Sequence, residues 1–166
     1  MVQGAVIKRY NDQLTSYYIE RLVPCADAAF RLALCVLLSP TAAKSVVKTT
    51  FKDIADGLAV VMRDLDPLSA VLSHCWKHLA AGAGGRPGVP PGDSPLLKAL
   101  APLTAETRGL LFLADVLGKD IGEIVLVTGF TEVDIRKHLA RSRWQFMRDP
   151  FARVELRQHE EAESEP

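Results

Sequence analysis

Residues 120–147 read DIGEIVLVTGFTEVDIRKHLARSRWQFM, and this stretch predicts two helices separated by a glycine turn. Asp120 is placed to cap the first helix, and Glu123, three residues on, is placed to complete a capping box. Gly129 ends that helix, because only glycine adopts a positive φ at little steric cost. The short turn that follows has the length found in helix-turn-helix units.

The second helix of this stretch is expected to have an apolar side and a cationic side. Thr131 starts it, and Asp134 occupies the position that closes a second capping box. The apolar positions expected to pack inward are Val133, Ile135 and Leu139. The cationic positions expected to face outward are Arg136, Lys137, His138, Arg141 and Arg143.

Such a helix, short, amphipathic and placed behind a tight turn, is typical of those that enter the major groove of DNA. Its N-terminal residues reach base edges and its flanking cations meet phosphates. The candidate DNA-binding residues are Thr131, Arg136, Lys137, His138, Arg141 and Arg143. The alternative is an ordinary helical hairpin whose arginines form a solvated face.

Size and composition allow a packed core. The chain has 166 residues, of which 48% are hydrophobic, enough for one ordinary domain or two small ones. The formal net charge is zero but uneven, because the residues after Arg148 hold six acidic side chains against two arginines. A modestly cationic body with an acidic tail is compatible with nucleic-acid binding, and the tail could fold back over the cationic helix as an autoinhibitor.

No apolar run approaches the length of a membrane span, and the first ten residues lack the pattern of a signal peptide. We therefore expect a cytoplasmic protein with no membrane contact. Three scattered cysteines, Cys25, Cys35 and Cys75, suit buried reduced thiols better than a disulfide framework.

Helical spacing and capping signals recur along the whole chain, so the predicted fold class is all-α. Residues 1–10 are expected to be a loose arm or the lead-in to a helix. Helices are expected over 12–22, where Pro24 interrupts, and over 26–38, 40–62, 67–79 and 96–100. Ser39 and Asp66 start two of these helices, each followed by a proline at the first helical position, and a further helix runs from its cap at Thr104 to a stop at Gly118. Alanine, glycine and proline dominate 80–95, which is expected to be a flexible linker. The predicted units are a four-helix domain at 1–80, the linker at 81–95, a helix-turn-helix domain at 96–150 and an acidic tail at 151–166.

Two C-terminal segments carry a resemblance to a known family. Residues 103–113, LTAETRGLLFL, look like the leucine, polar residues, arginine and apolar run that open the last domain of extracytoplasmic-function (ECF) sigma factors. The spacing from Glu123 through Gly129 to Arg143 is similar to the helix-turn-helix of that family, without an insertion. The resemblance implies a transcription regulator whose second helix binds promoter DNA, with Arg136, Lys137, His138 and Arg141 as base and phosphate contacts. The family usually opens that helix with glycine and threonine, where this chain has Val133 and Asp134.

The N-terminal half is similar to the family in layout but differs in chemistry. Where the family carries acids and glutamine that dock on RNA polymerase core, residues 43–51 read AKSVVKTTF. The corresponding polymerase-docking candidates are Lys44, Ser45, Lys48 and Thr49. A second reading follows from this change of charge: a sigma-like protein that has lost polymerase docking and promoter melting, and that binds an anti-sigma-type regulator or a second copy of itself.

Other constellations favour packing over chemistry. His74 and His78 lie one helical turn apart and invite a zinc hypothesis, but no further ligands are nearby in sequence, and Cys75 falls on an apolar stripe. We predict no metal and no cofactor. No set of nucleophile, base and oxyanion groups is evident, so the protein is not expected to be an enzyme. Trp144 is expected either to pack or to stack on a partner.

Overall fold

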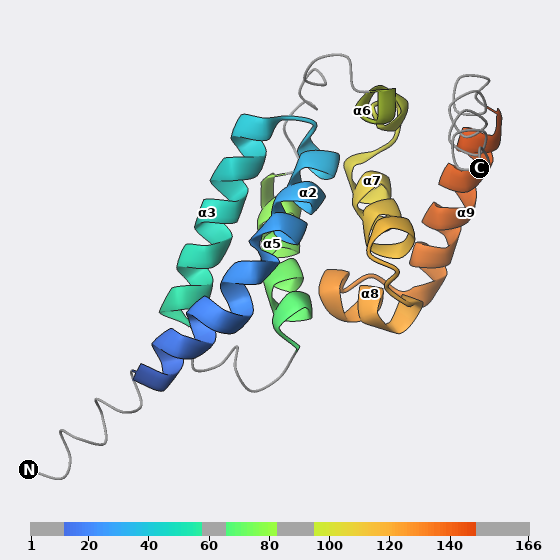
Figure 1. Ribbon diagram of the computed structural model, residues 1–166. Coiled ribbons are helices and arrows are strands. Elements are labelled where there is room, and N and C mark those ends of the chain that lie inside the picture. Colours follow the sequence, from blue (N-terminus) through green and yellow to red (C-terminus); the bar gives the residue numbers. More distant parts are fainter. Residues whose placement is uncertain (1–11, 58–65, 83–94, 149–166) are drawn as a thin grey trace, which may run out of the picture.

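Figure 1 presents the computed structural model, in which residues 12–57, 66–82 and 95–148 are described. These residues are helical over most of their length and contain no strand, which confirms the all-α class for the described ranges. Four predicted features lie wholly or mostly outside these ranges: the N-terminal arm, the last turn of the helix predicted to reach residue 62, the linker, and the acidic tail.

The N-terminal half is built on three packed helices. Residues 12–17 are helical and continue into two short turns, the second of which contains Pro24 at the predicted interruption. The elements are η1 (Tyr18–Leu22), η2 (Val23–Cys25), α2 (Ala26–Leu37), α3 (Pro40–Asp56) and α5 (Pro67–Gly82). Helices α2, α3 and α5 all contact one another, as Figure 1 shows.

The C-terminal half contains the predicted pair of helices and the elements that support them. Its elements are α6 (Pro95–Leu100), α7 (Ala105–Leu111), η3 (Phe112–Val116), α8 (Ile121–Thr128) and α9 (Glu132–Arg148). The helix predicted from Thr104 widens at η3 into a π-helical turn and stops at Gly118, whose φ is +63°. Helix α9 packs against both α7 and α8.

Helix starts follow the predicted capping residues. The side chain of Ser39 accepts a hydrogen bond from the backbone N–H of Ala42 at 3.3 Å, and α3 begins with proline, as expected. The side chain of Thr104 accepts from the N–H of Thr107 at 3.3 Å. Asp66 caps α5 through backbone N–H groups of its first turn. Local sequence therefore determines where these helices begin.

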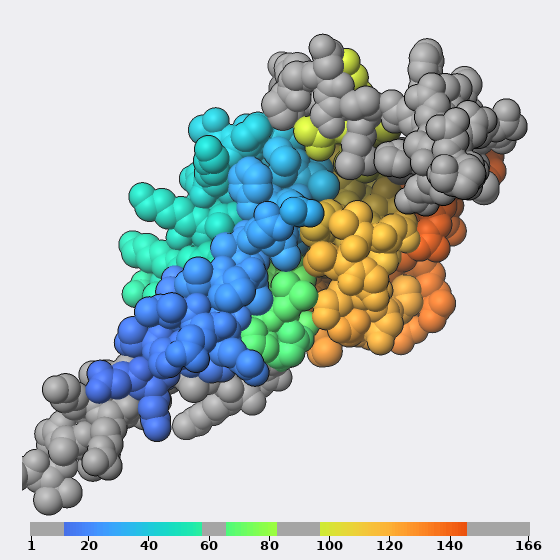
Figure 2. All heavy atoms as spheres, in the orientation of Figure 1, coloured from blue at the N-terminus to red at the C-terminus, as the bar shows by residue number. Residues whose placement is uncertain are grey.

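The two halves share one hydrophobic core. Helix α5 packs against α8, and α2 packs against α7. The ring of Trp76 meets that of Phe130 edge to face, with centroids 5.8 Å apart. A Cβ added to Gly109 would lie 2.4 Å from the Trp76 ring, so the helices approach at a distance that only glycine allows. In Figure 2 the blue and green atoms of the N-terminal half meet the yellow and orange atoms of the C-terminal half. The buried residues of both halves form one cluster, and the domain boundaries at 80 and 96 stay predictions.

A buried arginine joins the halves. Arg108 of α7 is 2% exposed, and its Nε donates to the carbonyl oxygens of Cys35 at 2.8 Å and Val36 at 3.2 Å. Its Nη1 donates to the carbonyl oxygen of Leu103 at 2.5 Å. The carbonyls in the last turn of a helix lack helical donors, so Arg108 satisfies groups that α2 itself cannot. Its charge also faces the negative end of the α2 dipole, although burial lowers the pKa of Arg108.

The chain reverses between α2 and α3 at a residue with unusual backbone geometry. Leu38 is the only non-glycine residue of the described ranges with a positive φ, at 53°, and its side chain is 1% exposed. Its N–H bonds to the carbonyl oxygen of Leu34 at 2.8 Å, which closes α2. Burial of the leucine side chain offsets the strain of the left-handed conformation.

Among the described residues, no helix combines the length and the apolar character needed to cross a membrane.

Candidate nucleic-acid interface

Helix α8 starts with the predicted capping box. Asp120 Oδ1 accepts from the backbone N–H of Glu123 at 2.8 Å, and Glu123 Oε2 accepts from the N–H of Asp120 at 3.0 Å. Lys119 donates to Glu123 at 2.6 Å, and this hydrogen bond lowers the pKa of the Glu123 carboxyl. The start of α8 is thus stabilised by three hydrogen bonds among neighbouring residues.

The turn after α8 has the predicted glycine conformation. Gly129 has a φ of 73°, and its N–H bonds to the carbonyl oxygen of Val125 at 2.8 Å. The Thr128 hydroxyl donates to the carbonyl oxygen of Ile124 at 2.7 Å and accepts from the N–H of Phe130 at 3.2 Å. These bonds fix the angle at which the chain leaves α8.

Thr131 caps α9, but the predicted capping box forms only in part. The Thr131 hydroxyl accepts from the N–H of Asp134 at 3.2 Å and donates to the Asp134 carboxylate at 2.7 Å. In a full capping box that carboxylate bonds to the backbone N–H of the capping residue. The carboxylate of Asp134 is therefore drawn back toward the start of the helix.

One side of α9 is buried against α7 and α8. Ile135 is 0% exposed and Leu139 is 5% exposed, as the apolar pattern predicts. Ser142 completes this side, and its hydroxyl donates to the carbonyl oxygen of Leu139 at 2.9 Å. Residues on the opposite side of the helix, such as Val133, Lys137 and Ala140, are exposed.

The inward packing predicted for Val133 is wrong. Its exposure is 73%, the highest among the large hydrophobic residues of the described ranges. Successive residues of a helix are turned by about 100°, so Val133 is turned by about 200° from Ile135 and cannot share its face. The apolar character of a residue does not by itself show on which face of a helix it lies.

The outward orientation predicted for His138 is also wrong. His138 is half-buried, and its Nδ1 lies 3.0 Å from the Thr107 hydroxyl in a hydrogen bond. Its ring stacks on Phe130, with centroids 6.3 Å apart and planes 15° apart. One ring nitrogen of His138 thus forms a hydrogen bond within the protein, and one face of the ring packs on an aromatic side chain.

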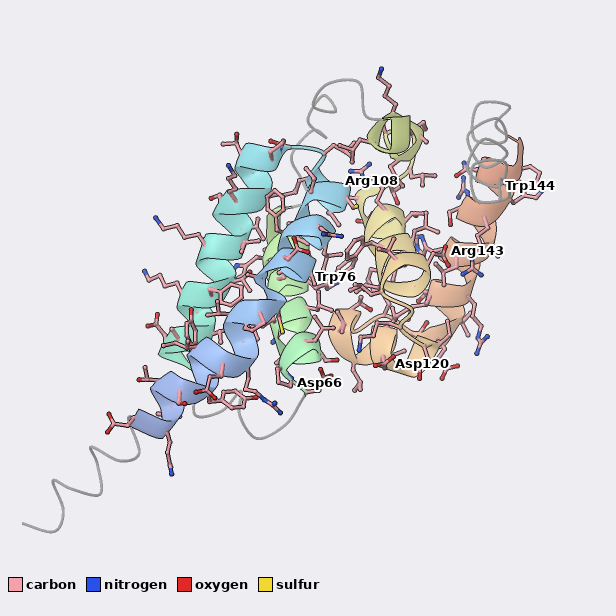
Figure 3. All side chains as sticks on the ribbon, in the orientation of Figure 1. Asp66, Trp76, Arg108, Asp120, Arg143 and Trp144 are labelled. Atoms are coloured by element: carbon pink, nitrogen blue, oxygen red, sulfur yellow. The ribbon has the colours of Figure 1, made fainter. Side chains whose placement is uncertain are left out.

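The remaining predicted cations of α9 are exposed. Lys137 and Arg141 are exposed, and no ion pair joins either of them to a described residue. Arg136 pairs with Glu132 one turn earlier at 3.5 Å. Arg143 is more constrained, since its Nη2 lies 2.5 Å from the Asp115 carboxylate of η3. Figure 3 shows Arg143 and Trp144 on α9 at the outer edge of the molecule.

The four polymerase-docking candidates lie together on α3. Lys44, Ser45, Lys48 and Thr49 are all exposed, and the Thr49 hydroxyl donates to the carbonyl oxygen of Ser45 at 3.1 Å. Helices α3 and α9 lie on opposite sides of the molecule in Figure 1. The two candidate surfaces are therefore separated by the whole shared core.

The histidine and cysteine positions of α5 have structural partners. Cys75 is buried, its Sγ donates to the carbonyl oxygen of Ala29 at 3.7 Å, and burial raises its pKa to about 12. His78 Nε2 lies 2.8 Å from the Asp53 carboxylate of α3. Within the described ranges, no three His, Cys, Asp or Glu side chains come close enough to hold a metal ion.

Comparisons of the chain with protein-family models, with curated proteins and with solved structures found no match. The resemblance to ECF sigma factors therefore stays an expectation that rests on the residues quoted above.

Proposed function

We propose that this protein is a sigma-like transcription regulator that binds promoter DNA by placing α9 in the major groove. The observation that carries the proposal is the geometry of α8, the Gly129 turn and α9, which leaves one side of α9 buried and the other exposed. An α-helix with its side chains is about 10–12 Å wide, and the major groove is about 12 Å wide.

The charges of α9 support this proposal. The helix sequence contains five Lys or Arg residues and two acids. Both acids are already engaged, Glu132 with Arg136 and Asp134 with Thr131. The repulsion expected between an acid at the groove mouth and DNA phosphates is therefore reduced, and Lys137 and Arg141 stay available.

Anisotropy measurements on a fluorescent duplex, at salt concentrations from about 50 to 200 mM, test the proposal. We expect the double variant Lys137→Gln/Arg141→Gln to bind more weakly and to reduce the log–log salt slope by about two, because it removes the two available cations. The matched control is Lys44→Gln/Lys48→Gln, which removes the same charge from α3 on the opposite side. Equal losses in both variants would show that binding is not centred on α9, and no binding by the wild type would end the proposal.

The N-terminal bundle is proposed to dock on RNA polymerase core through the exposed face of α3. This part rests on the family layout and on the exposure of Lys44, Ser45, Lys48 and Thr49. Lys44→Ala/Lys48→Ala removes both lysine side chains from this face and should weaken co-elution with purified bacterial core polymerase at low salt, while Lys137→Gln/Arg141→Gln on α9 should preserve it. A wild-type protein that does not co-elute contradicts this part alone.

The second candidate function is a protein–protein interaction module with an anti-sigma-type partner or a second copy. Two exposed apolar residues favour it, Leu126 on α8 at 63% and Val116 on η3 at 62%. Sedimentation over a range of concentrations tests self-association. A homodimer through this surface predicts that the sedimentation coefficient of the wild type rises with concentration. In the Leu126→Ser variant the coefficient should then stay constant.

A further inference from the structure

We infer that Val133 is a specificity residue that contacts the 5-methyl group of a thymine in the major groove. This inference rests on the proposed DNA binding by α9 and deepens it. It starts from the exposure of Val133, which is 73% in the first turn of the helix.

The fold gives no account of an exposed valine at this position. Valine is a weaker helix former than alanine, lysine or glutamate, because its branched side chain loses freedom in a helix. Val133 also buries little apolar surface in the protein, so it contributes little to the core. Single exposed hydrophobic residues are common on protein surfaces, so its position on the helix must decide what it does.

Val133 lies opposite the buried side of α9. At about 100° per residue, Lys137 is turned by about 40° from Val133, and Ala140 by about 20° in the other direction. Both are exposed. These three residues form the outermost line of the helix, directed away from the side buried by Ile135 and Leu139.

The arginines lie on either side of this line. Arg136 is turned by about 60° from Val133 in one direction, and Arg141 by about 80° in the other. Both are exposed. A helix laid in a groove with Val133 toward the bases would therefore direct one arginine toward each wall of phosphates.

The position of the Asp134 carboxylate in the first turn of α9 also favours a close approach to DNA. The carboxylate of Asp134, the residue after Val133, accepts a hydrogen bond from the Thr131 hydroxyl at 2.7 Å and is turned back toward the start of the helix. Recognition helices use their N-terminal residues for base edges, and Val133 is the second residue of α9.

Thymine is the base whose chemistry fits this side chain. A valine neither donates nor accepts a hydrogen bond, and the 5-methyl of thymine is the apolar group that standard bases present in the major groove. The methyl is absent from the minor groove and from uracil. Contact with it would bury apolar surface on both partners.

The experiment is a uracil scan of the protein's preferred duplex, obtained by selection from random sequence with the full chain. Each thymine is replaced in turn by deoxyuridine, which keeps base pairing and removes only the methyl group. We expect one or two adjacent positions to lose about threefold to fivefold in affinity, the effect of one buried methyl group. With Val133→Ala, this loss should shrink to within error at the same positions.

Ile19→Ala is the matched control, because it shortens another exposed apolar side chain, on η1 in the N-terminal half. It should leave the uracil profile of the wild type unchanged. Melting temperatures of both variants should match the wild type, since neither side chain is buried.

The outcomes separate this inference from the function on which it rests. Tight, salt-dependent binding by the wild type with a flat uracil scan overturns the thymine contact and leaves DNA binding intact. A uracil effect that persists in Val133→Ala assigns the contact to another residue and also overturns the inference. If the wild type binds no duplex, the inference and the proposed function both fail.

Discussion

The buried guanidinium of Arg108 donates hydrogen bonds to the carbonyl oxygen of Val36, a residue 72 positions earlier in the chain. This contact joins the start of the C-terminal half to the end of α2. Figure 3 labels Arg108 on the side of α7 that faces α2. Arg108 belongs to the motif that carries the family resemblance, and here it serves the protein's own architecture.

Arg108→Met should destabilise the protein by about 2–4 kcal/mol, because it leaves the carbonyls of Cys35, Val36 and Leu103 without this donor in a buried setting. Urea unfolding measures the loss. The control is Arg31→Met, which removes an exposed arginine paired with Asp27 and should change the unfolding free energy by at most about 1 kcal/mol. Similar losses in the two variants would contradict the assigned role.

Gly109→Ala should destabilise the protein by about 1–3 kcal/mol, since the new Cβ would lie 2.4 Å from the Trp76 ring and force the helices apart. Trp76 fluorescence should shift as its surroundings change. The control is Gly82→Ala at the end of α5, where an added Cβ meets no atom within 4 Å. A neutral Gly109→Ala would mean that the ring moves aside freely.

Gly129→Ala should cost about 1–2 kcal/mol, because φ at this position is 73° and alanine is strained there. It should also weaken the proposed DNA binding, since the turn sets the angle between α8 and α9. Gly57→Ala is the control: Gly57 also ends a helix, but its φ is −112°, which alanine adopts without strain. Thermal unfolding of the two variants gives the comparison, and equal melting temperatures would contradict the prediction.

Stability should fall as the pH is lowered, in part through His74. Burial lowers the pKa of His74, and Lys77 lowers it further, while Asp53 opposes the shift. The unfolded state therefore binds a proton more readily, so this contribution is fully present above about pH 6.5 and is lost as the pH falls below it. Between about pH 7.5 and pH 5.5, the unfolding free energy of His74→Gln should fall less than that of the wild type. Parallel pH profiles would exclude His74 as the cause.

The local structure was predictable from sequence where one residue determines it. Asp120 and Glu123 form the expected capping box, Gly129 takes the expected positive φ, and Ser39 and Thr104 cap the helices assigned to them. Each of these features depends on contacts within a few residues, so spacing alone was enough to find them.

The remaining features depend on tertiary packing, which spacing does not encode. Nothing near Arg108 indicates that it bonds to carbonyls of α2, and the edge-to-face contact of Trp76 with Phe130 joins residues on either side of the expected linker. The sequence pattern of α9 predicts an outward His138, because its partner, Thr107, is distant in sequence. The exposure of Val133 could have been found, since residues two apart on a helix point to nearly opposite sides.

The shared core determines how the chain responds to truncation. A truncated C-terminal piece starting near residue 95 would lose α2 and α5, and with them the packing of α2 on α7 and the contact of Trp76 with Phe130. Such a piece would present an uncovered apolar surface to water and aggregate. Because neither half holds a complete interior, both should melt in a single cooperative step, and the pair of helices α8 and α9 is best studied on the intact polypeptide.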